Sequence, residues 1–146
     1  MRVDQVWLGL LGAFACVAWS AEPLVAYRVV GDGIPTPLSR AAGNPARGQA
    51  IVVGRQSNCL LCHAVPGSGG HIAGNIGPSL AGVGGRLTEA QIRMRIVDPL
   101  TLNRDSIMPS YYRLEGGNRV AAEYRGRPVL DAQQIEDVVA YLHELQ

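Results

Sequence analysis

Apolar residues recur at helical spacing near the C-terminus of the chain. The positions i, i+3, i+4 and i+7 of this pattern are Ile135, Val138, Val139 and Leu142. This spacing places them on one face of a helix. Asp131, with Gln134 three residues later, forms a capping box that predicts where the helix begins. The pattern therefore predicts a C-terminal helix with one buried stripe.

Two further helix starts are marked by capping residues. Asn44-Pro45 joins an N-cap residue to proline at the first helical position, ahead of the stretch ARGQAIVVGRQ. Thr88 with Gln91 repeats the capping box, and the Asp-Pro pair at 98–99 ends the helix that follows. The sequence thus predicts helices that begin near residues 45, 88 and 131.

The segments between these helices read as irregular chain. Residues 21–44 are interrupted by glycine and proline, which predicts an extended N-terminal arm. The stretch PGSGGHIAGNIGPSLAGVGG is too rich in glycine and proline to predict regular structure. The stretch VAAEYRGRPVL has β-type residues around Arg125-Gly126 and predicts a small β-hairpin.

Composition adds one requirement to this picture. A chain of 146 residues suits one domain with a modest core. Its 18 Gly, 9 Pro and single Phe leave that core short of aromatic bulk, so a large buried apolar group would help to complete it. The formal net charge of +1 comes without a basic stripe or an acidic tail, which excludes a nucleic-acid-binding class.

The N-terminus has the pattern of a secretory signal peptide. A basic residue precedes the apolar run Val6–Trp19, and small residues precede a plausible cut after residue 20. The run is shorter than the roughly 20 apolar residues of a membrane-spanning helix, so we expect a signal peptide at 1–20 and no stable membrane anchor after cleavage. A lipoprotein cut before Cys16 is the alternative. Signal cleavage would leave Cys59 and Cys62 as the only cysteines of an exported, periplasmic protein.

The motif CLLCH at 59–63 is open to four interpretations. A thioredoxin-like redox pair should follow a strand, but this motif follows a predicted helix. A zinc site needs four ligands, and the adjacent Cys62 and His63 are poorly placed to share one tetrahedron. A disulfide across two residues is strained. A covalent haem uses every residue, because two thiols match two vinyl groups and the histidine reaches one face of the iron.

The iron then needs a second axial ligand or keeps an open site. The candidates after the motif are His71, Met94, Met108 and His143. Met94 lies within a predicted helix, where core packing is typical, and His143 lies in the last turn of another. His71 is expected to face solvent. Met108 lies in the irregular segment RDSIMPSYY, which can cross the distal face, and a His–Met pair suits electron transfer.

Residues around these ligands have two interpretations each. A metal-bound histidine normally donates its other ring N–H to a carbonyl, and the backbone oxygen of Pro78 is our candidate acceptor, with an ordinary Gly-Pro turn as the alternative. Tyr111 and Tyr112 could pack on the haem or within the core. Four arginines could neutralise haem propionates or contact a partner, with a solvated surface as the alternative. They are Arg86, Arg93, Arg95 and Arg104.

The order of these motifs resembles a known family. Helix, CLLCH, GPSLAGVGGR, helix, MPS and VVAYLHEL together resemble class I c-type cytochromes, which are all-α proteins wrapped around one covalent haem c. The stretches GNIGPSLAGVGGRLTEAQIRMRIVDP, IMPSYYR and YRGRPVLDAQQIEDVVAYL are similar to SoxX, the monohaem subunit of the SoxAX cytochrome of thiosulfate oxidation. The resemblance runs from about Ile34 to the C-terminus and implies a cytochrome c domain at 45–146.

The resemblance also implies roles for residues and partners. Cys59 and Cys62 would be the thioether links, His63 the proximal ligand and Met108 the distal ligand. No catalytic residue is expected, because the family's catalytic cysteine belongs to the partner subunit SoxA. The implied partners are a SoxA-like cytochrome, a SoxYZ-type carrier protein reached through the complex, and a downstream cytochrome c acceptor. The short arm before residue 45 departs from the family pattern.

Two alternative functions remain at this stage. One is a free-standing periplasmic class I cytochrome c that carries electrons without a dedicated partner. The other is a haem sensor with an open sixth position, which requires that Met108 does not bind the iron.

Overall fold

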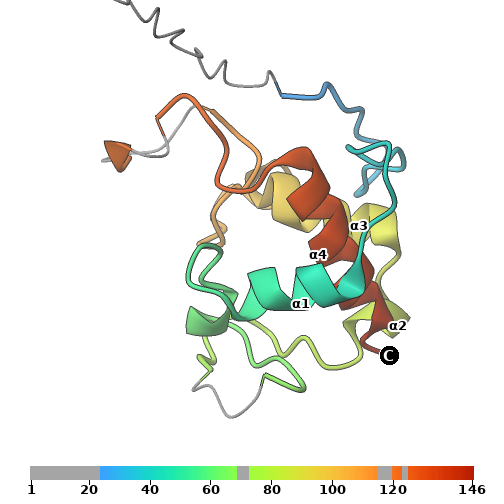
Figure 1. The fold of residues 1–146 in the computed structure, drawn as a ribbon, viewed down its shortest axis with the longest axis vertical. Helices are drawn as coiled ribbons and strands as arrows, with labels where there is room; N and C mark the ends of the chain where they lie inside the picture. The colour runs from blue at the N-terminus through green and yellow to red at the C-terminus, as the bar shows by residue number, and fades with distance from the viewer. Residues whose placement is uncertain (1–23, 69–72, 115–119, 123–124) are drawn as a thin grey trace, which may run out of the picture.

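The computed structural model describes residues 24–68, 73–114, 120–122 and 125–146 (Figure 1). Within these ranges the elements are α1 (Pro45–Val53), the 3₁₀ turn η1 (Cys59–Leu61), α2 (Val83–Arg86), α3 (Glu89–Val97), η2 (Pro99–Thr101) and α4 (Ala132–Glu144). The described ranges hold helices and no strand, so the all-α prediction is confirmed. The predicted signal peptide and Cys16 lie outside the described residues.

The helices begin where the capping residues predict. The Asn44 side chain accepts a hydrogen bond from the backbone N–H of Arg47 at the start of α1. Both capping boxes are complete, at Thr88 for α3 and at Asp131 for α4. Each cap satisfies backbone N–H groups that have no partner inside the helix. The sequence-predicted starts near 45, 88 and 131 are therefore confirmed.

Helices α1 and α4 cross at very short range (Figure 1). A Cβ atom at Gly48 would lie 2.6 Å from the carbonyl carbon of Asp137 and 2.8 Å from the Cβ atom of Tyr141, and nearer still to the Asp137 oxygen. Glycine is required here because any side chain would meet the backbone of α4 rather than a side chain that can move. The close crossing positions the start of the CLLCH segment, which follows α1.

Replacement of Gly48 by alanine should separate the two helices. We expect a loss of about 3 kcal/mol in the free energy of unfolding, at the upper end of the usual cost of overpacking. Urea unfolding followed by circular dichroism measures it. The matched control is Gly85→Ala in α2, where a new Cβ would meet only the Gln146 side chain at 3.5 Å, so stability should change by less than about 0.5 kcal/mol. Equal stability of the two variants would contradict this view of the crossing.

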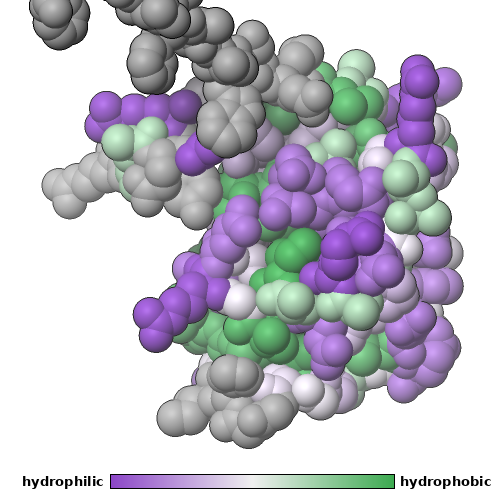
Figure 2. All heavy atoms as spheres, viewed as in Figure 1, coloured by the Kyte–Doolittle hydropathy of each residue, from purple (hydrophilic) through white to green (hydrophobic). Residues whose placement is uncertain are grey.

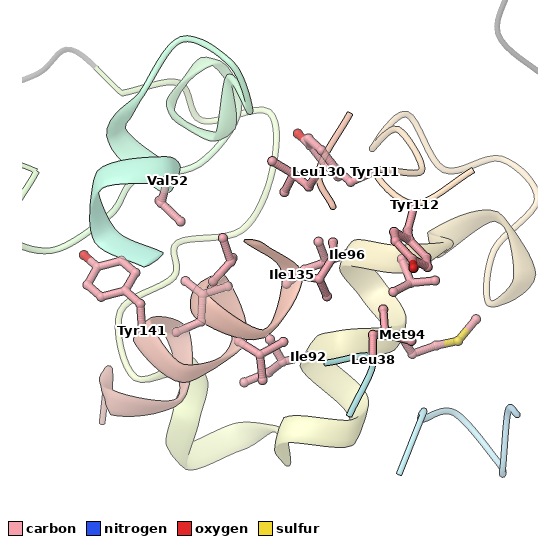
Figure 3. Close-up of a cluster of buried hydrophobic side chains, with 14 of the residues drawn as sticks. Leu38, Val52, Ile92, Met94, Ile96, Tyr111, Tyr112, Leu130, Ile135 and Tyr141 are labelled. Atoms are coloured by element: carbon pink, nitrogen blue, oxygen red, sulfur yellow. The ribbon is translucent and has the colours of Figure 1, made fainter. Parts of the chain in front are cut away.

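The hydrophobic core is built on α3 and α4 (Figure 3). Its labelled members are Leu38, Val52, Ile92, Met94, Ile96, Tyr111, Tyr112, Leu130, Ile135 and Tyr141. The predicted α4 stripe is buried, as are both tyrosines. The Met94 side chain is fully buried, which agrees with its interpretation as a packing residue.

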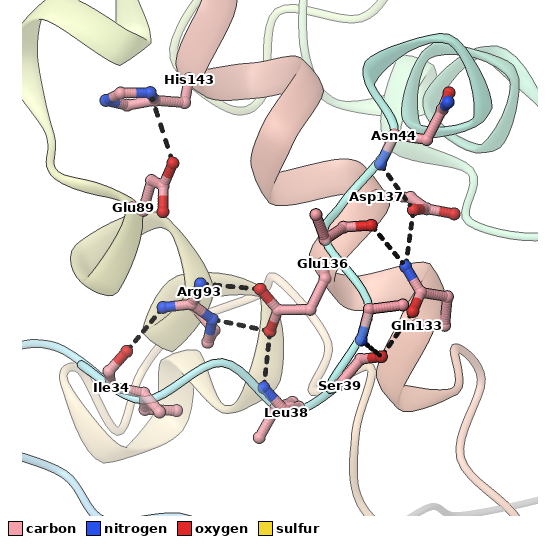
Figure 4. Close-up of polar contacts among 12 residues, drawn as sticks. Ile34, Leu38, Ser39, Asn44, Glu89, Arg93, Gln133, Glu136, Asp137 and His143 are labelled. Atoms are coloured by element: carbon pink, nitrogen blue, oxygen red, sulfur yellow. Dashed lines mark hydrogen bonds and ion pairs between the residues drawn. The ribbon is translucent and has the colours of Figure 1, made fainter.

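The N-terminal arm is fastened to α3 and α4 by a buried ion pair (Figure 4). Arg93 donates to both carboxylate oxygens of Glu136, at 2.8 and 2.7 Å. It also donates to the backbone oxygen of Ile34, and the backbone N–H of Leu38 donates to Glu136. The interpretation of Arg93 as a solvated residue is wrong, because a carboxylate on α4 and a carbonyl on the arm supply partners inside the fold.

Two local predictions are corrected by the structure. The Gly-rich segment contains a short helix, α2, which forms because Gly84 lies against the backbone of His143 and its N–H donates to the Leu145 oxygen. The hairpin is absent from residues 120–122 and 125–130, and its remaining residues lie outside the described ranges. In this segment Leu130 pairs its N–H with the Tyr111 oxygen, so that group is not available for a hairpin ladder.

In the described part of the chain, every helix is too short or too polar to span a membrane.

Candidate haem site

The CLLCH motif folds into a tight turn after α1. The N–H groups of Cys62 and His63 both donate to the Cys59 oxygen, at 3.2 and 3.0 Å. Residues three apart lie on the same side of a 3₁₀ turn, so the two cysteine side chains share one side. Asn58, with φ of 53°, supplies the left-handed residue that turns the chain into η1. Both thiols are free and half-buried.

The thiol of Cys59 lies in a partly enclosed environment. Burial raises its pKa, which outweighs the opposing effect of hydrogen bonds with Ser57 and Tyr111. Tyr111 donates its hydroxyl to the Ser57 oxygen at 2.6 Å, and burial raises the pKa of this phenol as well. At neutral pH both groups are therefore protonated. This environment favours a protected thiol over the exposed thiolate of a redox pair.

The segment after the motif returns alongside it and orients His63. Gly77 N–H donates to the Cys62 oxygen at 2.8 Å, and Leu80 N–H donates to the Ala64 oxygen at 2.9 Å. This pairing places the Pro78 oxygen 2.7 Å from His63 Nδ1, so the hydrogen bond predicted from the sequence is present. With the proton on Nδ1, the lone pair of Nε2 is available to bind a metal.

Gly77 leaves the space that the His63 imidazole occupies. A Cβ atom at this position would lie 2.7 Å from His63 Nδ1 and 2.9 Å from Nε2. The ring therefore occupies the space that a side chain would need. The Gly-Pro pair in the sequence is the only signal of this arrangement, and it is equally typical of an ordinary turn.

Met108 belongs to a different segment of the chain from the CLLCH motif. Its side chain is half-buried and packs against the hydrophobic cluster. Its connection to the motif runs through Tyr111, whose hydroxyl bonds to Ser57 just before CLLCH. Direct hydrogen bonds within one stretch of chain thus connect Cys59, Cys62, His63 and Pro78. Met108 is connected to this stretch only through Tyr111, three residues later.

The residues of the site fit a covalent haem. The donors are two free thiols on one side of a turn, an oriented imidazole and a thioether, which suit haem attachment and iron. Large apolar side chains beside them are exposed, namely Leu61 (68%), Ile76 (65%) and Ile107 (75%). Figure 2 shows hydrophobic side chains over α1 and the turn that follows it. Exposed apolar groups beside these donors favour a large apolar ligand.

Other kinds of site are less well supported. No group of three or more His, Cys, Asp or Glu side chains in the described ranges is arranged to hold a metal ion, which weakens the zinc interpretation. His71 lies outside those ranges. A shallow hollow of about 390 Å³ lies between the start of α1 and α4, and none of the predicted site residues lines it.

Comparisons with known proteins agree with this geometry. The family model described as cytochrome c matches residues 45–146, and the chain belongs to the cytochrome c family. A search of solved structures finds the crystal structure of SoxXA from P. pantotrophus, with 33% identity, a TM-score of 0.74, and coverage of 82% of this chain and 93% of that chain. The protein is a SoxX-type cytochrome, and its cofactor is one covalently bound haem c. No curated protein sequence matches the chain.

Some contacts around the site could not be found from the sequence. Ser57 and Tyr111 are 54 positions apart, and no motif links them. In the sequence Asp98 marks only the end of a helix, whereas its carboxylate contacts the segment that carries Met108. Contacts of this kind depend on tertiary packing, which a single sequence does not encode in a local pattern.

Proposed function

We propose that this chain is the electron-relay subunit of a periplasmic SoxAX-type complex. In this proposal Cys59 and Cys62 would attach the haem, His63 and Met108 would bind its iron, and Pro78 would orient His63. The observation that carries it is the hydrogen bond of 2.7 Å between His63 Nδ1 and the Pro78 oxygen, beside two free thiols on one turn. The bound haem supplies a one-electron redox centre.

The residues of the chain set how that centre behaves. The Pro78 carbonyl holds the Nδ1 proton, which fixes the ring and makes Nε2 a stronger donor. A neutral thioether from Met108 would favour the reduced state of a bound haem and raise its reduction potential. Cys59 and Met108 are half-buried against the hydrophobic core, and such burial would limit contact of a bound haem with water, which acts in the same direction.

The proposed partners follow from the chemistry of the complex. Joining thiosulfate to the thiol of a carrier cysteine forms one S–S bond and releases one proton and two electrons. A relay with one haem passes these electrons singly, so it needs both a donor partner and an acceptor. We assign the donor side to a SoxA-like cytochrome, in line with the SoxXA neighbour. A SoxYZ-type carrier and a downstream cytochrome c complete the sequence.

Met108→Ala tests the distal ligand. We expect the ferric protein to lose the weak absorption band at the red end of the spectrum that reports iron–methionine sulfur bonding. Covalent attachment should remain, because Cys59 and Cys62 are unchanged, and haem staining after denaturing electrophoresis measures it. The control is Met94→Leu, which changes a fully buried packing residue and should keep the band. A band that survives in Met108→Ala would exclude this ligand and favour the open-site sensor.

Copurification tests the complex. The tagged, haem-loaded protein is isolated from its native periplasm, and its haem reduction is followed after thiosulfate is added with and without the carrier protein. We expect a SoxA-like cytochrome to accompany it and reduction to require both additions. Isolation of the chain alone, with reduction by unrelated donors, would support the free-standing electron carrier instead.

A further inference from the structure

The segment that carries Met108 is held much more firmly on one side than on the other. After Met108, the N–H groups of Tyr111 and Tyr112 donate to the Ile96 and Val97 oxygens, which are among the last carbonyls of α3. These carbonyls have no partner within the helix, so residues 110–113 complete its end. Before Met108 the bonds are short-range, such as the one from Met108 N–H to Ser106 Oγ at 3.2 Å.

The carboxylate of Asp98 is the centre of this attachment. Ser110 donates its hydroxyl to Oδ1 at 2.7 Å, and Thr101 donates to Oδ2 at 2.9 Å. Arg113 lies 3.5 Å from Oδ2. Asp98 is 8% exposed. A carboxylate removed from water is stable only when its oxygens accept hydrogen bonds, and two of these three partners belong to the segment after Met108.

The place of Asp98 in the chain is not explained by local structure. It follows the last residue of α3, where the helix dipole disfavours a negative charge. It is also the N-cap position of η2, yet its side chain makes no capping hydrogen bond there. One local bond, from the Thr101 hydroxyl, reaches Oδ2, and the other contacts of the carboxylate are with Ser110 and Arg113. Local preference is therefore overridden by a tertiary role.

The chain between Ser110, which donates to Asp98, and Met108 is short and stiff. Only Pro109 separates Met108 from Ser110. Proline fixes its own φ near −65° and restricts the residue before it to extended conformations. A shift of Ser110 is therefore passed to the Met108 backbone with little loss through flexible torsions.

We propose that Asp98 is a positioning residue for the distal ligand, acting through Ser110 to hold Met108 in place. This inference rests on the proposed function, in which Met108 binds the haem iron. Residues 110–113, which are anchored to Asp98 and the end of α3, set the position of the Met108 thioether. Loss of the Ser110–Asp98 bond allows Met108 to leave more often and opens the distal position to other ligands.

The test is imidazole binding to the ferric, haem-loaded full chain, followed by the visible spectrum. Ser110→Ala should lower the half-saturating imidazole concentration about five- to tenfold, since a hydrogen bond to a charged group is lost. Asp98→Asn should act in the same direction. Ser110→Thr keeps the hydroxyl and should restore the wild-type value. The matched control is Ser39→Ala on the arm, which removes a hydroxyl bonded to Gln133 and should leave the imidazole concentration within twofold.

The measurements distinguish the positioning role of Asp98 from the proposal that Met108 binds the iron. If the wild-type protein shows methionine ligation and Ser110→Ala binds imidazole as the wild type does, the positioning role is overturned and the ligand assignment stands. If the wild type shows no methionine ligation, both are overturned. If Ser110→Ala and Ser39→Ala raise imidazole affinity equally, the effect is one of general stability and the positioning role is also overturned.

Discussion

Replacing Gly77 by alanine is expected to displace the ring of His63, the proposed iron ligand, while the helices stay folded. The new Cβ would lie within 2.9 Å of both ring nitrogens, so the imidazole cannot keep its bond to the Pro78 oxygen. Loss of such an orienting partner usually costs about 10- to 100-fold in metal affinity or activity. Here the steric conflict is added to that loss, because the ring itself must move.

The measurement for Gly77→Ala is the visible spectrum of the purified protein, together with its content of covalently bound haem. We expect a spectrum without normal histidine–methionine ligation and a helical circular dichroism signal close to the wild type. Gly85→Ala, whose Cβ would make only an ordinary contact with the Gln146 side chain at 3.5 Å, is the control and should behave as the wild type. A wild-type spectrum in Gly77→Ala would show that His63 has another position available to it.

The second large effect is expected at the ion pair beneath the N-terminal arm. Glu136→Leu would leave the Arg93 guanidinium, only 2% exposed, without its carboxylate. Breaking a buried pair by removing one partner costs about 3 to 5 kcal/mol, because an uncompensated charge remains inside. The arm would loosen as well, since Leu38 N–H loses its acceptor.

The double variant Arg93→Met/Glu136→Leu separates charge from packing. It removes both charges and retains apolar volume, so it should recover most of the stability lost in Glu136→Leu. Urea unfolding of the wild type, both single variants and the double variant completes the thermodynamic cycle. A double variant as unstable as Glu136→Leu would show that the arm depends on the specific hydrogen bonds of the pair rather than on neutralising Arg93.

The parts of the fold that could be predicted are those with short-range causes. Capping residues act on N–H groups within the next three residues, and for this reason the starts of α1, α3 and α4 follow from Asn44, Thr88 and Asp131. The CLLCH turn is local in the same way. His63 and the Pro78 oxygen were matched from general metal chemistry, although their contact depends on the return of the chain.

The parts that could not be predicted depend on distant partners. Arg93 resembles any other surface arginine in the sequence, and only Glu136, 43 positions later, explains its burial. The short helix α2 was hidden by its glycines, which weaken helices locally but allow close contact with α4. The predicted hairpin is absent from the described residues because a distant contact replaces the local one. The Leu130 N–H donates to the Tyr111 oxygen instead of to a strand partner.

The crossing of α1 and α4 also decides which changes in chain length the fold can accept. It joins residues about 90 positions apart, as in the pair Arg47–Asp137, and so closes a long loop that contains CLLCH and Met108. The entropy of closing a loop grows only with the logarithm of its length, and a doubling costs about 0.6 kcal/mol. Insertions in the surface turns between the two helices should therefore be cheaper than one added methyl group at Gly48. Changes in the length of those turns should therefore be tolerated at positions where the fold would reject even a small side chain in place of that glycine.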